Sequence, residues 1–415
     1  MTRHAATLST EARAPVRSPA SAAAGDLRLA LAGGGTGGHI VPGLHLLETA
    51  RACGPRIGDV VWFTSGRAIE DRVLERLESD AAGNAFERVR FALEPAGGGA
   101  PAKGALVWRA PRAVFLAREA LVRHRSQVLL GLGGFTSLPA VIAARSLSIP
   151  VALLEINAVP GSATRWLSRF ATRVYHAWRG SARAMNPSGA PSAQHRWIGP
   201  PLAPAFRAGV VPDSASGRAR AAAARAQLGF DASKPLLVVL GGSQGSSALN
   251  RFVQQHGPAL VASGIQVLHQ TGPAKASEAC APFSGYRSVA YVDPVLTALS
   301  AATLVLTRGG ASTLAEIAAL RQPSIVVPYP HHADRHQEKN ALELEGGTRI
   351  VQEEHLTTKL REEIVALCGP SGAGERESMS RALSAAVPLE GATRLCTELC
   401  ELAAAAAVRG AASRA

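Results

Sequence analysis

The chain has 415 residues, which is too long for one ordinary hydrophobic core and predicts two domains of about 200 residues each. Hydrophobic residues make up 47% and charged residues 18%, as in a globular protein, and no apolar run reaches the roughly 18 residues that a membrane-spanning helix requires. The net charge of +13 favours an anionic partner, such as a phosphorylated substrate or an anionic membrane surface. Nucleic acid is not expected, because aromatic residues are only 5% and the arginines are dispersed.

Neither the amino-terminal segment nor the cysteines predict a chemical function. Residues 1–25 contain the single acid Glu11 and lack the continuous apolar core of a secretory signal. We expect a disordered tail there, with an organelle transit peptide as the alternative. The five cysteines have no C-x-x-C spacing, as expected of buried thiols in a reducing compartment. Cys396 and Cys400 share a helical face, but no His or third Cys lies nearby in sequence, so no metal site is predicted.

Apolar runs of strand length alternate with helix-length patterns in both halves of the chain, which predicts βαβ crossovers and parallel sheets. The predicted strands are 27–32, 60–64, 128–132, 150–154, 236–240, 266–269, 304–307 and 324–327. A polar stretch rich in Ala and Arg separates the two groups. The fold class is therefore α/β, with two doubly wound domains that face each other across a cleft. The predicted division is a tail at 1–25, a first domain at 26–210, a linker at 211–234, a second domain at 235–390 and a carboxyl-terminal helix and tail at 391–415.

The first predicted strand is followed by GGGTGGH at 33–39 and then by a helical pattern. A loop with five glycines lets its backbone approach a ligand closely, and a helix that follows aims its N–H groups at an anion. Gly33, Gly35 and Gly38 also satisfy the dinucleotide pattern G-x-G-x-x-G, which demands an acid at the end of the next strand. No acid stands there, because the segment 59–67 ends in Ser-Gly-Arg. We therefore expect an anionic or polar substrate rather than NAD.

The second half of the chain twice repeats this arrangement of a strand, a glycine-rich loop and a helix. GGSQG at 241–245 follows a strand, and RGGAST at 308–313 leads into a helix that contains Glu316. A helix amino terminus binds anions, whereas a carboxylate beside it can accept hydrogen bonds from two vicinal hydroxyls. That combination suits a phosphorylated ribose. A capped helix starting at Asp334 would explain that residue, but not the polar pair His336 and Gln337 directly after a buried strand.

Six motifs in this order resemble the MurG family, over residues 27–350. The motifs are GGTGGH at 34–39, GGFTS at 133–137, EINAVPG at 155–161, GGSQG at 241–245, RGGAST at 308–313 and DRHQEKNA at 334–341. The resemblance implies a GT-B fold of two Rossmann-like domains. It also implies an inverting transferase that moves N-acetylglucosamine from UDP-N-acetylglucosamine to undecaprenyl-diphosphate-muramoyl-pentapeptide (lipid I), which forms lipid II for peptidoglycan. Such an enzyme works at the cytoplasmic face of the plasma membrane, as a peripheral protein, in cell-wall synthesis.

The resemblance also implies a role for individual residues of the second domain, which binds the donor. Ser243 and Gln244 would contact the diphosphate, and Glu316 the ribose hydroxyls. Val292 would meet uracil through its backbone. The sugar would be bound by His336, Gln337 and the amide of Ala311.

In the first domain, the family places Thr36, Gly37 and Gly38 at the acceptor diphosphate. His39 and Asn157 would lie near the reacting hydroxyl. His39 has a suitable unperturbed pKa for a general base, and orientation of a diphosphate is the alternative role. Backbone amides of 242–245 can stabilise the leaving group, and no Asp-x-Asp motif is present, so no metal and no cofactor is expected.

The chain departs from the family at two places. Ala203 stands where the family often has a diphosphate-binding arginine, and Arg207 is a candidate substitute. The frequent Glu-Gln-Asn is Glu-Ile-Asn at 155–157. Three other functions stay open on the sequence alone: a GT-B transferase acting on another lipid such as diacylglycerol, a UDP-N-acetylglucosamine epimerase, and a basic binding protein.

The segment 104–125 is a candidate membrane-binding surface. It combines Trp108, Phe115 and aliphatic residues with five arginines and one acid, which is the composition of an interfacial patch. The alternative is an ordinary surface helix in which Val114, Leu121 and Val122 pack into the core.

Overall fold

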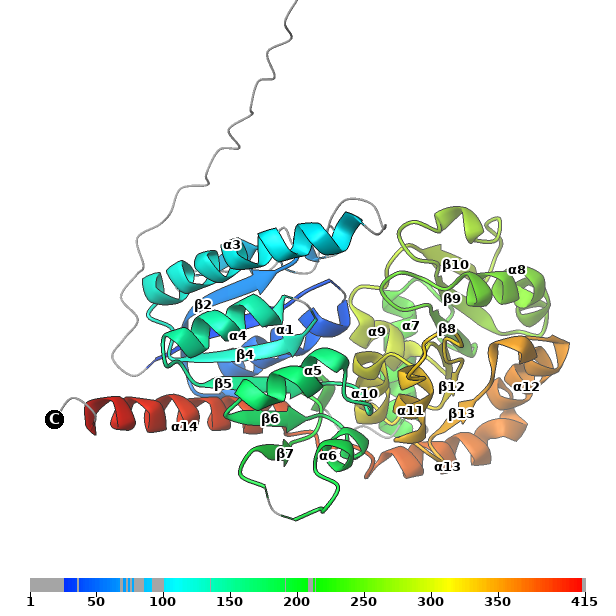
Figure 1. Cartoon of the computed structure of the whole chain (residues 1–415). Coiled ribbons are helices and arrows are strands. Elements are labelled where there is room, and N and C mark those ends of the chain that lie inside the picture. Colours follow the sequence, from blue (N-terminus) through cyan, green and yellow to red (C-terminus); the bar gives the residue numbers. More distant parts are fainter. Residues whose placement is uncertain are drawn as a thin grey trace, which may run out of the picture.

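The computed structural model describes residues 26–35, 37–67, 70, 71, 74, 77, 86–91, 101–134, 136–190, 192–207, 212 and 214–412, without the side chains of 101–108. The predicted tail at 1–25, Thr36 and the side chain of Trp108 lie outside the described residues. The described chain folds into two parallel sheets that lie side by side, each flanked by helices (Figure 1). The predicted α/β class is therefore confirmed.

The first sheet has seven strands in the order β3-β2-β1-β4-β5-β6-β7. They are β1 (Leu27–Gly33), β2 (Ile57–Thr64), β3 (Phe86–Arg90), β4 (Val128–Gly133), β5 (Val151–Glu155), β6 (Arg173–His176) and β7 (His195–Trp197). The strand order reverses between β1 and β4, and ligands of doubly wound sheets bind outside the carboxyl ends of the strands at such a point.

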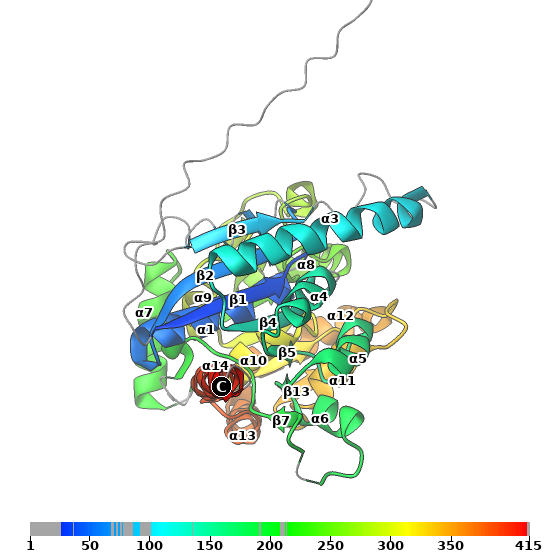
Figure 2. The same cartoon turned by 60° about the vertical axis from the view of Figure 1, so that its left-hand side comes forward.

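Two helical layers cover the first sheet. One layer contains α3 (Pro101–Arg123), α4 (Ser137–Ser146) and α5 (Ser162–Leu167), which pack against one apolar cluster. The other contains α1 (Gly37–Cys53) and α14 (Gly391–Ala412), which share a second cluster. Figure 2 shows α14 end-on beside α1. The last helix thus returns to the first domain, where Leu395 and Leu399 are completely buried.

The second sheet has six strands in the order β10-β9-β8-β11-β12-β13. They are β8 (Leu236–Leu240), β9 (Gln266–Gln270), β10 (Tyr286–Val289), β11 (Leu304–Thr307), β12 (Ser324–Val326) and β13 (Thr348–Ile350). Its helices are α7 (Ala215–Gln227), α8 (Ser247–Ala262), α9 (Val295–Ala301), α10 (Ala311–Ala319), α11 (His336–Leu342), α12 (Thr358–Cys368) and α13 (Ala373–Leu383). The strand order reverses between β8 and β11.

All eight predicted strands are present, and the described residues contain five further short strands that were not predicted: β3, β6, β7, β10 and β13. The range predicted as a linker contains helix α7, which packs against α9 of the second domain. The chain passes between the domains twice, once after β7 and once before α14. These two segments lie close together, since a Cβ added to Gly199 would lie 2.9 Å from Pro388. No helix among the described residues is long and apolar enough to cross a membrane.

Candidate active site

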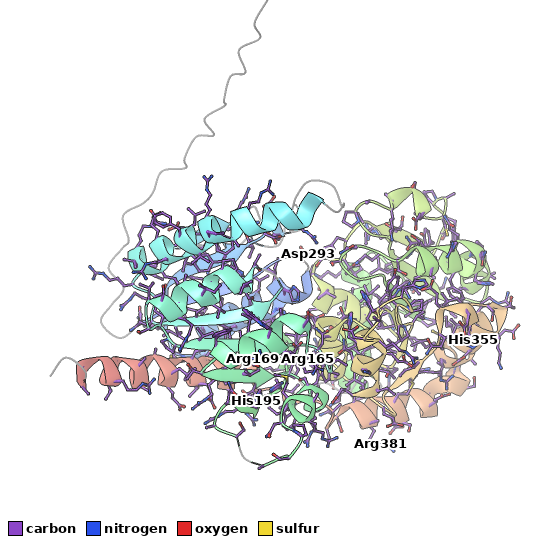
Figure 3. The ribbon with its side chains drawn as sticks, viewed as in Figure 1. Arg165, Arg169, His195, Asp293, His355 and Arg381 are labelled. Atoms are coloured by element: carbon purple, nitrogen blue, oxygen red, sulfur yellow. The ribbon has the colours of Figure 1, made fainter. Side chains whose placement is uncertain are left out.

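The two glycine loops from opposite domains meet in the cleft. Gly37 begins α1 directly after the first loop, and a Cβ placed on it would lie 3.3 Å from Cβ of Ser243, in the loop after β8. Figure 3 labels Asp293, the neighbour of Val292, at the boundary of the two domains. The predicted acceptor and donor loops are therefore brought into contact by the fold, although their sequences are about 200 residues apart.

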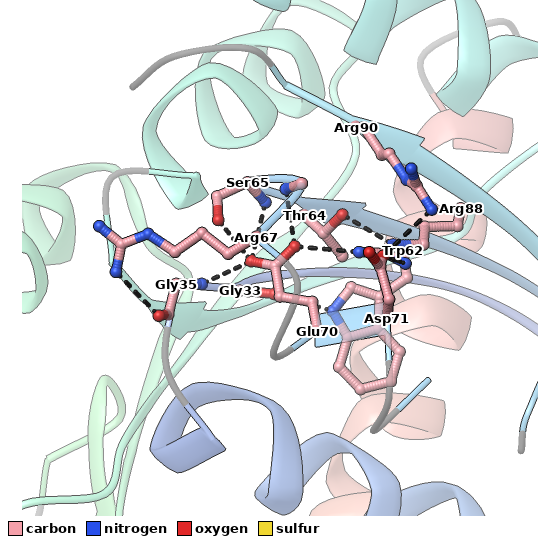
Figure 4. A network of polar contacts seen from close by, with 11 residues as sticks. Gly33, Gly35, Trp62, Thr64, Ser65, Arg67, Glu70, Asp71, Arg88 and Arg90 are labelled. Carbon is pink, nitrogen blue, oxygen red and sulfur yellow. Dashed lines mark hydrogen bonds and ion pairs between the residues drawn. The ribbon is translucent and has the colours of Figure 1, made fainter. Parts of the chain in front are cut away.

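The first glycine loop is held by a buried carboxylate that the sequence did not single out, Glu70 (Figure 4). Glu70 Oε1 accepts hydrogen bonds from the N–H of Gly35 at 2.6 Å and from the N–H and hydroxyl of Ser65. Glu70 Oε2 accepts from the N–H of Gly66 at 2.7 Å and from Arg88 at 3.1 Å. Burial alone would raise the pKa of Glu70, but the hydrogen bonds from Ser65, Gly35 and Gly66 outweigh it, so the pKa is lowered.

A guanidinium lies at the same loop. Arg67 donates from Nη1 to the carbonyl of Gly35 at 3.0 Å, and Figure 4 shows its side chain beside that glycine. Gly35 has φ of 88°, a conformation that favours glycine, so its carbonyl can turn towards Arg67. Positive charge is therefore present next to the loop that was predicted to bind a diphosphate.

His39 is held in the neutral form that a general base needs. Its Nδ1 lies 3.0 Å from the carbonyl of Gly34, which can only accept, so Nδ1 carries a proton and Nε2 is the unprotonated nitrogen of the neutral ring. Burial lowers the pKa of His39, with opposing contributions from Gly34 and Glu155. The ring packs on the backbone of Gly133 and Gly134, where a Cβ would approach it to 3.1 and 3.3 Å. The GGFTS motif thus makes room for the imidazole.

Asn157 takes part in a hydrogen-bonded contact between the domains, centred on Asn340 of α11. Asn340 donates from Nδ2 to Oδ1 of Asn157 at 3.2 Å and to the carbonyl of Gly309 at 3.0 Å. Its Oδ1 accepts from the N–H of Ala158 at 2.7 Å. Glu155 fixes the Asn157 turn by accepting from its N–H at 3.0 Å. The completely buried Asn340 therefore ties the turn at Asn157 to the loop after β11.

The predicted donor-binding residues Ser243 and the exposed Gln244 lie in the turn between β8 and α8, whose N-cap is Ser246. Gln270 braces this turn, since its Nε2 donates to the carbonyl of Gly242 at 2.7 Å. Gln270 Oε1 accepts from the N–H of Val292 at 3.1 Å, so a backbone contact of Val292 with a base is left to its carbonyl.

The sugar-binding candidates surround the start of α11. Gln337 Oε1 accepts from the N–H of Gly309 at 3.2 Å and from that of Tyr329 at 3.0 Å, which aims its amide NH₂ away from both. His336 Nδ1 lies 2.8 Å from Oδ1 of Asp334, so Nδ1 donates to this carboxylate and Nε2 points elsewhere. The start of α10, with Ala311 as its first residue, lies next to this cluster across Gly309.

Glu316 is buried on α10 and faces the first domain. Burial raises its pKa to about 8, so the side chain is protonated at neutral pH. Its Oε1 lies 3.9 Å from Nε2 of His45 on α1. His45 is itself neutral, because burial lowers its pKa to about 4, and its Nδ1 donates to the carbonyl of Pro201. His45 therefore lies against the carboxyl group that was predicted to bind the ribose, and little of that group is exposed.

The structure does not place Arg207 at the first glycine loop. Its Nη2 donates to Thr49 and its Nη1 pairs with Glu390, near the carboxyl end of α1. Thr49 lies 12 residues after the start of α1, or about 18 Å along the helix axis. Arg207 therefore lies away from the first glycine loop, at which Arg67 is the nearer cation.

Comparisons with known proteins agree with this arrangement. Residues 29–176 match the glycosyltransferase family 28 N-terminal domain, and residues 236–389 match its C-terminal domain. The UDP-N-acetylglucosamine--N-acetylmuramyl-(pentapeptide) pyrophosphoryl-undecaprenol N-acetylglucosamine transferase of Sorangium cellulosum is 36% identical, over 90% of this chain and 88% of its own. The chain belongs to the MurG family. A MurG relative from Synechococcus is 32% identical over 90% of this chain and 95% of its own.

Solved structures share the fold. The crystal structure of Acinetobacter baumannii MurG superposes with a TM-score of 0.60 at 21% identity and covers 89% of this chain and 98% of that one. A putative UDP-N-acetylglucosamine 2-epimerase from Listeria monocytogenes gives a TM-score of 0.62 at 15% identity, over 88% of this chain and 93% of that one. Because transferases and epimerases share the GT-B fold, the fold does not distinguish them, whereas the sequence identity to MurG transferases does.

Proposed function

We propose that this protein transfers N-acetylglucosamine from UDP-N-acetylglucosamine to the lipid-linked muramoyl pentapeptide, with inversion at the sugar C1. The contact between Gly37 and Ser243 carries the proposal, because it puts the acceptor-side and donor-side loops against each other. His39, at the third position of α1, then lies at the same junction. The proposal includes no metal and no cofactor.

In this mechanism Nε2 of His39 takes the proton of the acceptor hydroxyl as its oxygen attacks C1. The C1–O bond to UDP breaks, and the negative charge that develops on the diphosphate is met by the amides of the Ser243 turn and the start of α8. Gln337 and His336 orient the sugar. Gln337 uses its amide NH₂, because its Oε1 is already bonded to Gly309 and Tyr329, and His336 uses Nε2, because its Nδ1 faces Asp334. Thr36, Gly37 and Gly38 would bind the acceptor diphosphate, with Arg67 as the nearby positive charge.

The activity is tested by incubating the purified protein with radiolabelled UDP-N-acetylglucosamine and a soluble lipid I analogue. A labelled disaccharide product with inverted anomeric configuration is expected. Release of an epimerised sugar nucleotide without acceptor would instead indicate an epimerase. Transfer to diacylglycerol alone would indicate a different lipid acceptor. The Gln337→Ala variant should weaken donor binding by about 5- to 150-fold, for a loss of about 1 to 3 kcal/mol.

We further propose that the α3, α4 and α5 layer faces an anionic membrane surface. Phe115 of α3 is 66% exposed and Ile142 of α4 is 45% exposed. Trp166 of α5 and Phe170 just after it are also exposed, and their rings contact each other in a tilted arrangement with centroids 5.2 Å apart. Arg165 and Arg169 lie together on this segment (Figure 3). The alternative of an ordinary surface helix placed Val114, Leu121 and Val122 in the core. Leu121 is fully buried and Val114 packs partly against the core, but Val122 is 56% exposed. Helix α3 therefore packs with one side and exposes apolar and basic residues on the other.

Vesicle binding tests this surface. Co-sedimentation with anionic vesicles should decrease as salt rises, because each basic residue near the bilayer contributes about 1 kcal/mol and is screened. Changing Arg109, Arg112 and Arg118 to Gln should weaken binding much more than changing the three second-domain residues Arg251, Arg361 and Arg381. Equal losses in the two triple variants would move the membrane-facing surface elsewhere.

A further inference from the structure

A cavity of about 860 Å³ lies in the second domain, at the opposite end of its sheet from the catalytic loops. Its lining includes the residues that come just before four of the strands: Pro235 before β8, Ile265 before β9, Thr303 before β11 and Pro323 before β12. The proposed donor site follows the carboxyl ends of the same strands. Strand β8 is 5 residues long and separates the two ends by roughly 16 Å. The cavity is therefore not part of the transferase site.

Four arginines line this cavity. Arg218, Arg220 and Arg225 come from α7, the helix within the predicted linker, and Arg376 comes from α13. None of the described lining residues is Asp or Glu. Arg376 is 9% exposed and donates to the carbonyls of Leu367 and Gly369. The cavity thus concentrates positive charge from two helices that are far apart in sequence.

Two of the α7 arginines, Arg220 and Arg225, donate to neutral acceptors. Arg225 donates to the carbonyl of Ala301 at 2.8 Å and to the hydroxyl of Thr303 at 2.9 Å, and also to the carbonyl of Ala232. Arg220 donates to the hydroxyl of Ser300 at 3.0 Å. These contacts fix the direction of both guanidinium groups but do not neutralise them. Guanidinium groups held in this way are preorganised for an anion.

The surroundings of Arg225 make a bound anion favourable. Burial lowers the pKa of Arg225, and the neighbouring positive charge of Arg376 lowers it as well. The adjacent thiol of Cys368 supplies no negative charge at neutral pH, because burial raises its pKa to about 12. Removing charges from water is costly unless an opposite charge compensates them. An anion in the cavity would supply that compensation.

We propose that this cavity binds a phosphorylated small molecule of nucleotide size. Planar guanidinium groups match the geometry of phosphate oxygens, and several of them around one space suit more than one phosphate. Ile265, Leu320 and Val365 form an apolar part of the lining, which suits an uncharged ring. The volume lies within the range of about 300 to 1,000 Å³ that is typical of small-molecule sites.

Isothermal titration of the full chain with ATP and with inorganic pyrophosphate tests the proposal. Saturating UDP is added first, so that the donor site cannot account for the heat. One equivalent of ATP should bind in a salt-sensitive manner, and pyrophosphate should bind to the same site. Arg218→Gln and Arg220→Gln should each weaken binding about 10-fold or more, since each removes a charge-assisted contact. Arg251→Gln on α8 is the matched control, because it makes the same change of charge on an exposed helix outside the cavity.

Several outcomes would overturn the proposal. No binding of either ligand to the UDP-saturated protein would do so, as would equal weakening in the Arg251→Gln control. Asp213 lies outside the described residues but adjoins the lining residue Pro212 in sequence, so Asp213→Asn is a second control. If ATP binds to the Asp213→Asn variant but not to the wild type, the carboxylate of Asp213 occupies the place proposed for the phosphate. Transferase activity of Arg218→Gln is measured in parallel, and retained activity separates this site from the proposed catalytic one.

Discussion

Replacing Glu70 by glutamine should release the first glycine loop without changing the shape of the side chain. The carboxylate accepts from Gly35, Ser65 and Gly66 and pairs with Arg88, and its own side chain is completely buried. A glutamine NH₂ group must face some of these donors, so at least one N–H loses its acceptor. Breaking a buried ion pair costs about 3 to 5 kcal/mol. Because Arg88 keeps Asp71 as a partner at 2.6 Å, we expect the lower end, about 3 kcal/mol.

The assay combines urea unfolding, donor titration and turnover. Glu70→Gln should lower the free energy of unfolding by about 3 kcal/mol and reduce turnover, because the loop beside His39 loses its fixed geometry. Donor affinity should stay unchanged, since the donor loops belong to the other sheet. Asp71→Asn is the control: its carboxylate is half exposed and bonds the same Arg88, so it should cost less than about 1 kcal/mol. If Glu70→Gln unfolds like this control and retains full turnover, Glu70 does not hold the loop.

Three further predictions concern the cleft. The pKa of Glu316 is about 8 in the folded protein against an ordinary value of 4.5 in the unfolded chain, so its contribution to the free energy of unfolding should decrease from pH 5 to pH 8. Comparing urea unfolding of wild type and Glu316→Gln at both pH values should show a smaller decrease for the variant, and parallel slopes would contradict the burial of this group. His39→Ala should lower turnover about 10²- to 10⁴-fold with unchanged donor affinity by calorimetry, and an unchanged rate would exclude His39 as the base. Asn340→Ala should lower the melting temperature, at a cost of about 1 to 3 kcal/mol, and should be non-additive with Asn157→Ala; full additivity would mean that the two amides do not couple.

The sequence predicted the central strands of both sheets because they are buried on both faces and therefore form continuous apolar runs. Strand β8 is the clearest case, with all five residues buried. The missed strands lie towards the sheet edges, where side chains are partly exposed and the apolar pattern is weak. Strand β3 has the sequence FERVR and no fully buried residue, and β7 has only three residues. Helix α7 was hidden for a similar reason, because its Ala and Arg residues resemble a polar linker although Ser214 caps its amino terminus.

The site was predictable where one short motif contains both the glycines of a loop and a reactive side chain, as in the glycine-rich loop that ends at His39. It was not predictable where a residue acts on a motif from elsewhere in the chain. Glu70 stands 35 residues after Gly35, and nothing in its local sequence identifies it as the acceptor for that loop. Asn340 is a stronger case, since its three contacts join Asn157, Ala158 and Gly309 across two domains. Because each of these contacts satisfies a polar group that would otherwise be buried without a partner, the cleft geometry depends on residues that never need to touch the substrate.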